Sequence, residues 1–248
     1  IVLRASATRM SPAPVAGISS SQVANATMAK VKICGITSLA ALDAALLCGT
    51  DYIGLVFFAK SPRDIVFDVA KQLAARARGR AQIVALVVDP DPDLLGTLYR
   101  DVRPDIIQLH GTETPEFVAN VRHSIPGVGI WKALPVAETS DVGAAEKYMQ
   151  PGELADLILF DAKPVPGAKL PGGNGLSFDW TILDGLADRF PFVLAGGLNP
   201  DNVAAAIKLT KAAVVDVSSG VESRPGKKNP VLIERFIAAA KPVGQSAA

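Results

Sequence analysis

Cys34 and Asp161 are the side chains best suited to moving protons, and each lies at the end of a short apolar segment. A cysteine in such a segment is more often a small buried residue, and an aspartate at the end of a strand often caps a turn. A fold that brings the ends of its strands together would place this thiol and this carboxyl group at one site. Beside a sugar phosphate, the pair could act as general base and general acid. The other cysteine, Cys48, lies on the apolar face of an expected helix, and we interpret it as a core residue.

Two glycine-containing loops could bind a phosphate group. The first contains Gly196 and Gly197, and the second contains Ser218, Ser219 and Gly220. Glycine lets backbone N–H groups approach an anion closely. One such loop could be only a turn after a strand, but two loops in corresponding positions favour a phosphate site.

Short β-branched segments alternate with helical ones along the chain, which predicts the elements that position these residues. The eight expected strands are 31–34, 52–57, 82–88, 105–109, 128–133, 156–161, 192–195 and 213–217. Almost all are continuously apolar, as in parallel sheets that are covered on both faces. Expected helices span 39–49, with Thr37 as a possible N-cap and Gly49 closing it, and 67–79, 199–210 and 229–241.

Strand–helix alternation implies parallel strands joined by right-handed crossovers. Eight such units in residues 30–248 predict a single-domain α/β fold, the (β/α)8 or TIM barrel. An open doubly wound sheet would usually have fewer strands and a glycine-rich fingerprint after the first, whereas CGIT stands there. In a barrel, chemistry takes place at the C-terminal ends of the strands, and the loops after strands seven and eight recurrently bind phosphate.

Composition excludes several classes of partner. Among 248 residues, Lys and Arg number 25 and Asp and Glu 24, so the net charge of +1 gives no basic field for nucleic acid. Two cysteines and two histidines are too few for a disulfide framework or a cysteine-rich zinc site. No apolar run approaches the ~18 residues that span a bilayer. We therefore expect a cytoplasmic protein that binds neither nucleic acid nor membrane, and we expect no metal.

The first 29 residues have a different composition from the rest. They are rich in Ser, Ala and Thr, lack any periodicity of 2 or 3.6, and contain no continuous apolar core of a signal peptide. We interpret 1–29 as a disordered leader or a non-native extension, with Met28 as a plausible start.

Seven motifs, in order along residues 30–240, resemble those of the phosphoribosylanthranilate isomerase family of tryptophan biosynthesis. They are KICGIT at 32–37, GLVFFAKSPR at 54–63, QLHGTE at 108–113, LILFDAK at 157–163, GGNGLSFDW at 172–180, LAGGLNPDNV at 194–203 and VDVSSGVESRPGKKN at 215–229. The resemblance implies a (β/α)8 barrel. It also implies an Amadori rearrangement of N-(5-phosphoribosyl)anthranilate to the 1-deoxyribulose 5-phosphate, without cofactor or metal.

The resemblance also implies roles for particular residues. Cys34 matches the base that removes the proton from C2 of the sugar, and Asp161 matches the acid that protonates the ring oxygen. Arg63 matches the arginine that meets the anthranilate carboxylate; without the resemblance it would be read as an exposed loop residue. Gln108 and Asp216 occupy motif positions in the substrate site without an individual role.

The residues alone leave some questions open. His110 is read as a hydrogen-bonded structural residue rather than a catalyst. The family usually has GGTG where this chain has Asn174 in GGNG, which puts any role of the threonine hydroxyl in doubt. The related isomerase of the histidine pathway typically has Asp where Cys34 stands, and a noncatalytic phosphate-sugar-binding protein is a further alternative. The chain could be a monomer or a homodimer.

Lys32 is the residue that could favour the thiolate. An ordinary thiol, with a pKa of ~8.5, is mostly protonated at neutral pH. Strand alternation places Lys32 on the same face as Cys34, about 6.6 Å below it. If that face points into the barrel, the ammonium group would lower the pKa of the thiol. Alternatively, Lys32 points outward or pairs with a carboxylate such as Asp216.

Overall fold

The structure, a computed structural model, describes residues 29–149, 154–165, 167–168 and 170–241. Eight parallel strands form a closed barrel in the order β1 to β8. The strands are β1 (Lys30–Cys34), β2 (Tyr52–Phe57), β3 (Gln82–Val87), β4 (Ile106–Leu109), β5 (Gly129–Val136), β6 (Leu157–Ala162), β7 (Phe192–Leu194) and β8 (Val214–Val217). The predicted (β/α)8 barrel is confirmed.

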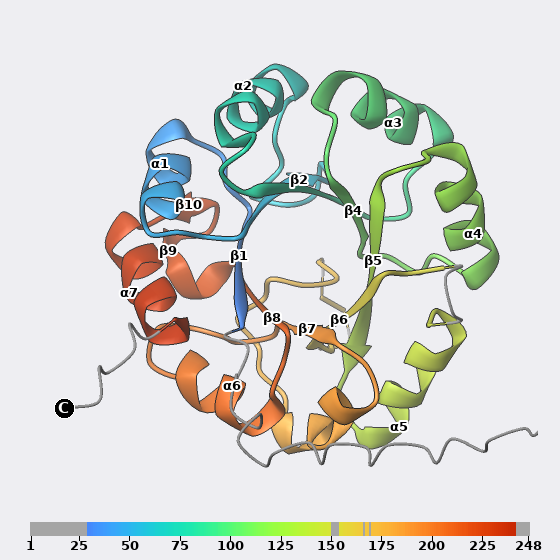
Figure 1. Cartoon of the computed structure of the whole chain (residues 1–248), viewed down its shortest axis with the longest axis vertical. Coiled ribbons are helices and arrows are strands. Elements are labelled where there is room, and N and C mark those ends of the chain that lie inside the picture. Colours follow the sequence, from blue (N-terminus) through green and yellow to red (C-terminus); the bar gives the residue numbers. More distant parts are fainter. Residues whose placement is uncertain (1–28, 150–153, 166, 169, 242–248) are drawn as a thin grey trace, which may run out of the picture.

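Helices surround the barrel as an outer ring (Figure 1). The α-helices are α1 (Leu39–Leu47), α2 (Phe67–Ala77), α3 (Pro92–Thr97), α4 (Pro115–Ser124), α5 (Thr139–Val142), α6 (Val203–Thr210) and α7 (Pro230–Ala240). The other helices are the π-helix η1 (Leu98–Val102) and the 3-10 helices η2 (Gly143–Lys147), η3 (Trp180–Leu183), η4 (Leu186–Asp188) and η5 (Ser219–Val221). Between β6 and β7 the described chain forms η3 and η4, so two short 3-10 helices stand where the alternation predicts a helix.

The helix after β1 begins one residue later than Thr37 would place it. Ser38 is the N-cap of α1, and its side chain accepts a hydrogen bond from the backbone N–H of Ala41. Thr37 instead donates its hydroxyl proton to the carbonyl of Gly226, at 3.3 Å. The prediction of Thr37 as the cap was therefore wrong, because that hydroxyl is used in a contact with a distant loop.

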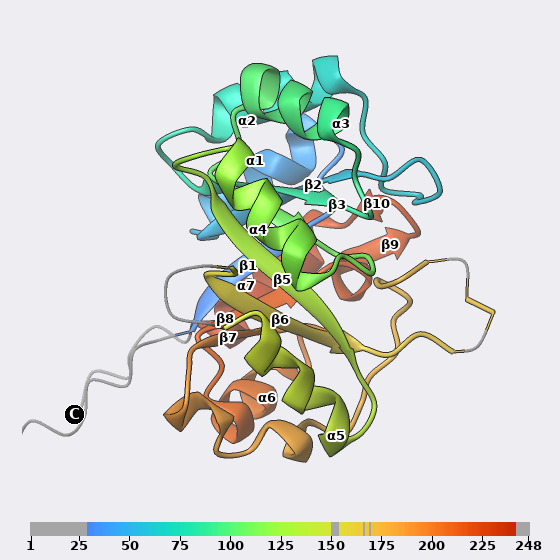
Figure 2. The same cartoon turned by 90° about the vertical axis from the view of Figure 1, so that its right-hand side faces the viewer.

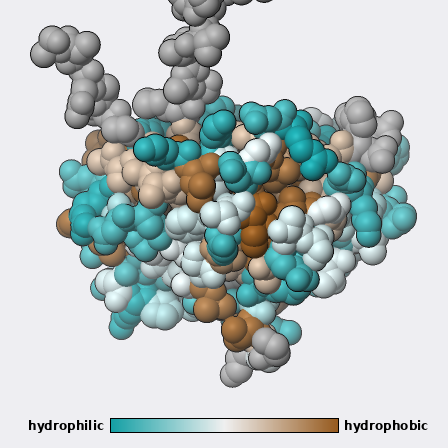
Figure 3. Space-filling model, turned by 90° about the horizontal axis from the view of Figure 1, so that it is seen from below, coloured by the Kyte–Doolittle hydropathy of each residue, from teal (hydrophilic) through white to brown (hydrophobic). Residues whose placement is uncertain are grey.

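Apolar side chains fill both faces of the strands. Inside the barrel, Tyr52 and Trp131 pack edge to face with ring centroids 5.0 Å apart, within a cluster that includes Val84, Leu159 and Val193. A larger cluster lies between the strands and the helices. This double burial explains the continuously apolar strand sequences. On the face shown in Figure 3, hydrophobic residues form small patches among hydrophilic ones.

A small antiparallel ribbon follows β8 and lies at the end of the barrel toward which the strands run. It consists of β9 (Glu222–Arg224) and β10 (Lys227–Lys228). Figure 2 shows the ribbon and the described parts of the loop after β6 on this same side of the molecule. Both segments therefore lie near the strand ends where chemistry is expected.

The ends of the chain lie mostly outside the described residues. Residues 1–28, which make up nearly all of the expected leader, are among these. Ala29 is described and buried, so the packed structure includes at least this residue of the segment that we assigned to the leader. No helix of the described chain is long and apolar enough to cross a membrane.

Candidate active site

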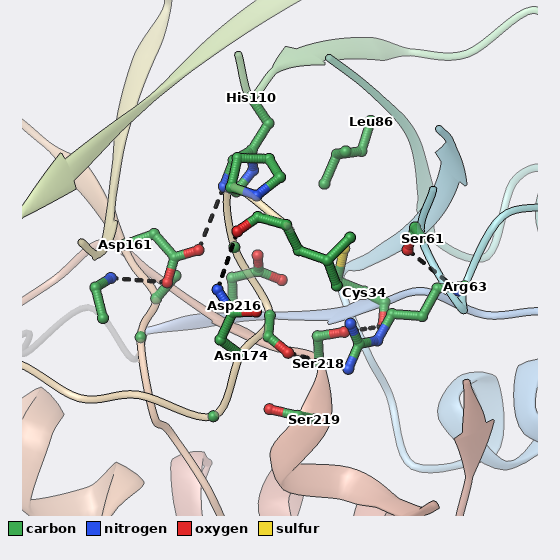
Figure 4. Close-up of a pocket in the computed structure, with 18 of the residues that line it drawn as sticks. Cys34, Ser61, Arg63, Leu86, His110, Asp161, Asn174, Asp216, Ser218 and Ser219 are labelled. Carbon is green, nitrogen blue, oxygen red and sulfur yellow. Dashed lines mark hydrogen bonds and ion pairs between the residues drawn. The ribbon is translucent and has the colours of Figure 1, made fainter. Parts of the chain in front are cut away.

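A pocket opens at the C-terminal ends of the strands and brings together most of the predicted site residues (Figure 4). The predicted residues that line it are Cys34, Arg63, Asp161, Gly196, Gly197, Asp216, Ser218 and Ser219. They come from β1, β6, β8 and the loops after β2, β7 and β8. Barrel closure thus assembles one site from positions spread over the whole chain.

Cys34 lies at the base of this pocket and is buried. Burial raises the pKa of its thiol above the usual value, and the charge of Asp216 adds to this rise. Lys32 and Lys228 lower the pKa, but burial dominates and the net shift is upward. The predicted attraction between Lys32 and the thiol is therefore present, yet it is smaller than the effect of burial.

Lys32 points into the barrel and is fully buried. Its Nζ lies 3.1 Å from Oδ1 of Asp216, so the lysine both faces the interior and pairs with the carboxylate considered in the sequence analysis. Burial lowers the pKa of Lys32, but Asp216 and Cys34 raise it by more, so the ammonium group stays charged. Gly54 leaves room for this contact, since a Cβ there would lie 2.9 Å from Cys34 Sγ and 3.2 Å from Lys32 Nζ.

Asp161 is held at the opposite side of the pocket by two contacts. Its Oδ1 accepts a hydrogen bond from the backbone N–H of Ala162 at 2.8 Å. Its Oδ2 lies 3.3 Å from Nε2 of His110, which itself lines the pocket. His110 is hydrogen-bonded, as expected, and its partner is the candidate acid.

Gln108 lies below the pocket rather than on its wall. Its side chain is fully buried, and its Nε2 lies 2.8 Å from Nδ1 of His110. The structure therefore does not place Gln108 where it could touch a substrate directly, contrary to its assignment as a substrate-binding residue.

Arg63 is buried, so the reading of an exposed loop arginine was wrong. Its guanidinium group forms two hydrogen bonds with Glu222, Nε to Oε1 at 2.8 Å and NH2 to Oε2 at 2.9 Å. NH2 also donates to the carbonyl of Gly173 at 3.2 Å. These contacts fix the guanidinium plane at the edge of the pocket.

Glu222 joins Arg63 to the loop after β8 through Lys228. Lys228 Nζ lies 2.6 Å from Oε1 of Glu222 and donates to the Ser218 carbonyl at 3.0 Å. Burial lowers the pKa of Lys228. For Glu222, burial raises the pKa, but hydrogen bonds and charge from Arg63 and Lys228 lower it by more, and the net shift is downward. With both cations charged, the group holds one positive charge in excess, which favours anion binding.

The two glycine-containing loops meet beside this group. Gly196 and Gly197 adopt φ angles of 83° and 69°, a region that favours glycine. Ser218 donates from its hydroxyl to the Cys34 carbonyl at 3.2 Å, and Ser219 begins η5. Gly220 does not line the pocket. A Cβ there would collide with the carbonyl of Leu198, so this glycine permits close packing of the two loops.

The loop that contains GGNG covers the pocket from above. Asn174 lines the pocket and donates from Nδ2 to the Leu170 carbonyl at 3.1 Å. A Cβ on Gly172 would collide with Asp161 Oδ2 and lie 2.6 Å from His110 Nε2, so the backbone passes directly over these two side chains. Asn174 thus stabilises the loop from within.

Sequence reasoning missed Glu222 and Lys228. Both lie within VDVSSGVESRPGKKN, but a charged residue in a glycine-containing loop normally indicates a solvated surface. Only their burial beside Arg63 and Ser218 identifies them. Within the described residues, no group of three or more His, Cys, Asp or Glu side chains could hold a metal ion.

Comparisons with known proteins agree with this geometry. The model of the family N-(5'-phosphoribosyl)anthranilate (PRA) isomerase matches residues 31–239. The isomerase of that name from Paramagnetospirillum magneticum is 51% identical over 212 residues, covering 86% of this chain and 97% of that protein. The one from Rhodopseudomonas palustris strain BisA53 is 49% identical, covering 85% and 95%.

Solved structures show the same relationship. Phosphoribosyl anthranilate isomerase from Thermotoga maritima superposes with a TM-score of 0.75 at 33% identity, covering 86% of this chain and 98% of that one. A structure of such an isomerase in complex with reduced 1-(o-carboxyphenylamino)-1-deoxyribulose 5-phosphate has a TM-score of 0.73 at 32% identity, with the same coverage. The family match spans most of the sequence and includes every motif on which the resemblance was based, so this chain belongs to the N-(5'-phosphoribosyl)anthranilate isomerase family.

Proposed function

We propose that this chain isomerises N-(5'-phosphoribosyl)anthranilate to 1-(2-carboxyphenylamino)-1-deoxyribulose 5-phosphate, a step of tryptophan biosynthesis, with Asp161 as general acid and Cys34 as general base. The observation that carries the assignment is that both side chains line one pocket together with Arg63 and the glycine-containing loops after β7 and β8. Thiol and carboxyl groups positioned in this way suit a pair of proton transfers. The family membership supports the reaction, and the pocket supports the division of roles.

The chemistry needs one proton donated and one removed. Asp161 gives a proton to the ring oxygen, the C1–O bond breaks, and the nitrogen lone pair forms a C1=N iminium ion. The Cys34 thiolate then takes the proton from C2, and the electron pair of that bond forms a C1=C2 enolamine. Tautomerisation of the enolamine, with a proton added at C1, yields the ketone at C2.

Two groups of residues would orient the substrate. Backbone N–H groups near Gly197 and Ser219 would bind the phosphate, as is usual for loops after strands seven and eight. Arg63 would bind the anthranilate carboxylate. Its Nε and NH2 contact Glu222, whereas NH1 has no hydrogen-bond partner among the described residues. NH2 also donates to the Gly173 carbonyl, so a carboxylate would approach NH1.

A turnover assay tests the proposal. N-(5'-phosphoribosyl)anthranilate is generated in situ because it is labile, and the loss of its fluorescence is followed after adding the purified chain. We expect rapid loss with the wild type and strongly reduced rates with Asp161→Asn and Cys34→Ser. A wild-type chain that binds the substrate without converting it would show that the protein is a noncatalytic binder. Full activity of Asp161→Asn would remove Asp161 from the acid role.

The proposed chemistry also bears on location and assembly. A free thiol as base suits a reducing compartment, so we propose a cytoplasmic enzyme. One similar structure describes monomers made from a dimeric isomerase of Thermotoga maritima. We propose that this chain acts as a monomer or a homodimer, two states that sedimentation velocity at assay concentration distinguishes.

A further inference from the structure

A line of contacts runs from the barrel interior to the candidate acid. Gln108 on β4 contacts His110. His110 in turn contacts Asp161 on β6 (Figure 4). The two distances are 2.8 Å between Gln108 Nε2 and His110 Nδ1, and 3.3 Å between His110 Nε2 and Asp161 Oδ2. The proton transfers described above make no use of Gln108 or His110.

The orientation of the Gln108 amide specifies the state of the imidazole. Gln108 Nε2 is only a donor, so Nδ1 of His110 accepts and the ring proton lies on Nε2. This N–H faces Asp161 Oδ2, which can accept a hydrogen bond from it. Gln108 thus selects the tautomer that can hold the acid between turnovers.

The same pair can also support the protonated acid. Gln108 Oε1 is buried and has no hydrogen-bond partner within the described chain. A half-turn of the amide brings Oε1 to Nδ1, which then carries the proton, and leaves the Nε2 lone pair to accept from the Oδ2–H of Asp161. Because an amide offers both a donor and an acceptor, Gln108 can hydrogen-bond to Nδ1 of either neutral tautomer of His110, and neither residue changes its charge.

The hydrogen bond that Oδ1 accepts leaves Oδ2 as the oxygen that carries the proton. Oδ1 already accepts the Ala162 N–H, and the backbone at Gly172 lies over the His110–Asp161 pair. The other titratable groups that face this pair are Asp216, which is paired with Lys32, and Cys34 in the same pocket. None of these supplies a second donor to Oδ2 in the described structure.

We propose that Gln108 and His110 are positioning residues that hold the carboxyl group of Asp161 in place in the pocket in both of its protonation states. The inference rests on the proposed role of Asp161 as general acid. Loss of either contact leaves the carboxyl group free to turn, and small misplacements of a catalytic group cost up to about 10²-fold in rate.

The test compares four variants with the wild type. His110→Leu and Gln108→Met remove the two contacts, and Gln108→Met nearly preserves the side-chain volume. His110→Gln restores an N–H near the position of Nε2. His123→Leu is the matched control, because His123 is exposed on α4, away from the pocket. For each variant, kcat and KM are measured on protein shown to be folded by circular dichroism.

We expect kcat to fall about 10–100-fold in His110→Leu and Gln108→Met, while KM changes less than about threefold. His110→Gln should recover at least part of the loss, and His123→Leu should match the wild type.

Three results would overturn the proposal. These are wild-type kcat in both folded variants, a loss that appears only in KM, and a loss in His110→Leu that His110→Gln does not reduce. Asp161→Asn separates the two hypotheses. If it is inactive while the Gln108 and His110 variants are fully active, only this inference fails. If it is active, the assignment of the acid fails as well.

Discussion

At Cys34, burial and charge act on the thiol in opposite directions. Burial raises its pKa, and the positive charges of Lys32 and Lys228 lower it by less. The thiolate that the reaction needs is therefore a minor form of the free enzyme at neutral pH. Its supply depends on Lys32 and Lys228, so the base is sensitive to two charges that do not line the pocket.

Replacing Cys34 by Ser should abolish most activity. A serine hydroxyl is a far weaker base than a thiolate, so we expect kcat to fall by about 10²–10⁴-fold, the usual contribution of a positioned base. Cys48→Ser provides the control, since Cys48 is only partly buried and packs against the core behind α1. Its kcat should stay near the wild-type value while its melting temperature changes. Equal rates for Cys34→Ser and the wild type would rule out Cys34 as the base.

Lys32→Met tests the source of the thiolate. Removing the ammonium group removes an attraction that lowers the pKa of the thiol, so that pKa should rise. The high-pH limb of the activity profile should move to higher pH, and so should the midpoint of alkylation by iodoacetamide. The variant also leaves Asp216 without its buried partner, a change that typically costs about 3–5 kcal/mol in the free energy of unfolding.

Lys32→Met/Asp216→Asn separates stability from tuning. The double variant should regain much of the lost stability, because no unpaired buried charge remains. An alkylation profile of Lys32→Met that coincides with that of the wild type would show that Lys32 serves only to pair with Asp216.

Among the elements of the fold, the loops after β7 and β8 carry a prediction about anions. If they bind the phosphate of the substrate, inorganic phosphate and sulfate should inhibit competitively. Gly197→Val should raise KM by about tenfold or more, equivalent to about 1.4 kcal/mol of binding free energy. Valine at position 197 would be strained for two reasons. The φ angle there is 69°, which side chains rarely adopt, and a Cβ would lie 2.6 Å from Cβ of Ser177.

Gly49→Ala is the control for the glycine effect. Gly49 also has a positive φ, of 77°, but a Cβ there would meet open space at the end of α1. This variant should lose some stability and keep the wild-type KM. Failure of phosphate to compete at high concentration would contradict the assignment of the loops.

The ribbon after β8 predicts a pH dependence of stability through Glu222. The pKa of Glu222 is lower in the folded state than its usual value, so its carboxylate stabilises the fold above that usual value. This contribution is lost as the pH falls through the lower, folded-state pKa. Glu222→Gln should therefore unfold more easily than the wild type at pH 7, and the difference should shrink in acid. Chemical denaturation at a series of pH values measures it, and a difference independent of pH would contradict the assignment.

The sequence predicted the strands well because burial on both faces leaves an uninterrupted apolar signal. The structure shifts half of the sixteen strand ends by one residue, and it extends β5 to Val136, three residues past the predicted end. Pro135 lies in that extension, and proline normally argues against a strand because it lacks an N–H donor. The 3-10 helices between β6 and β7 were not predicted, since they depend on tertiary packing rather than on an amphipathic period.

Of the site residues, the sequence could predict only those whose positions follow from the path of the strands. The ends of the strands located Cys34 and Asp161, and strand alternation correctly predicted the inward direction of Lys32 as one of its alternatives. The partners of Arg63 and Asp161 could not be predicted in this way. Glu222 is 159 residues from Arg63 along the chain, and no local pattern reports such a contact.

At the scale of the whole molecule, the site depends on closure of the barrel between its first and last strands. β1 pairs with β8 in a register that places Lys32 opposite Asp216. The ion pair under the thiol, the contact between Ser218 and the Cys34 carbonyl, and the group around Glu222 all join the two ends of the chain. We call these contacts between β1 and β8 the β1–β8 seam. Substitutions that weaken the seam should therefore reduce activity even where the other strands stay folded.

The segment before β1 gives the prediction that belongs to this scale. The family match begins at residue 31, and the leader falls almost wholly outside the described residues. We expect deletion of residues 1–27 to leave kcat, KM and the melting temperature nearly unchanged. Deletion of residues 1–31 is the contrasting variant, because it removes the buried Ala29 and the Lys30 N–H that donates to the Ala213 carbonyl at 2.9 Å. That variant should lose both stability and activity through the β1–β8 seam. A fall of several degrees in melting temperature for the shorter deletion would show instead that the leader packs on the barrel and contributes to its closure.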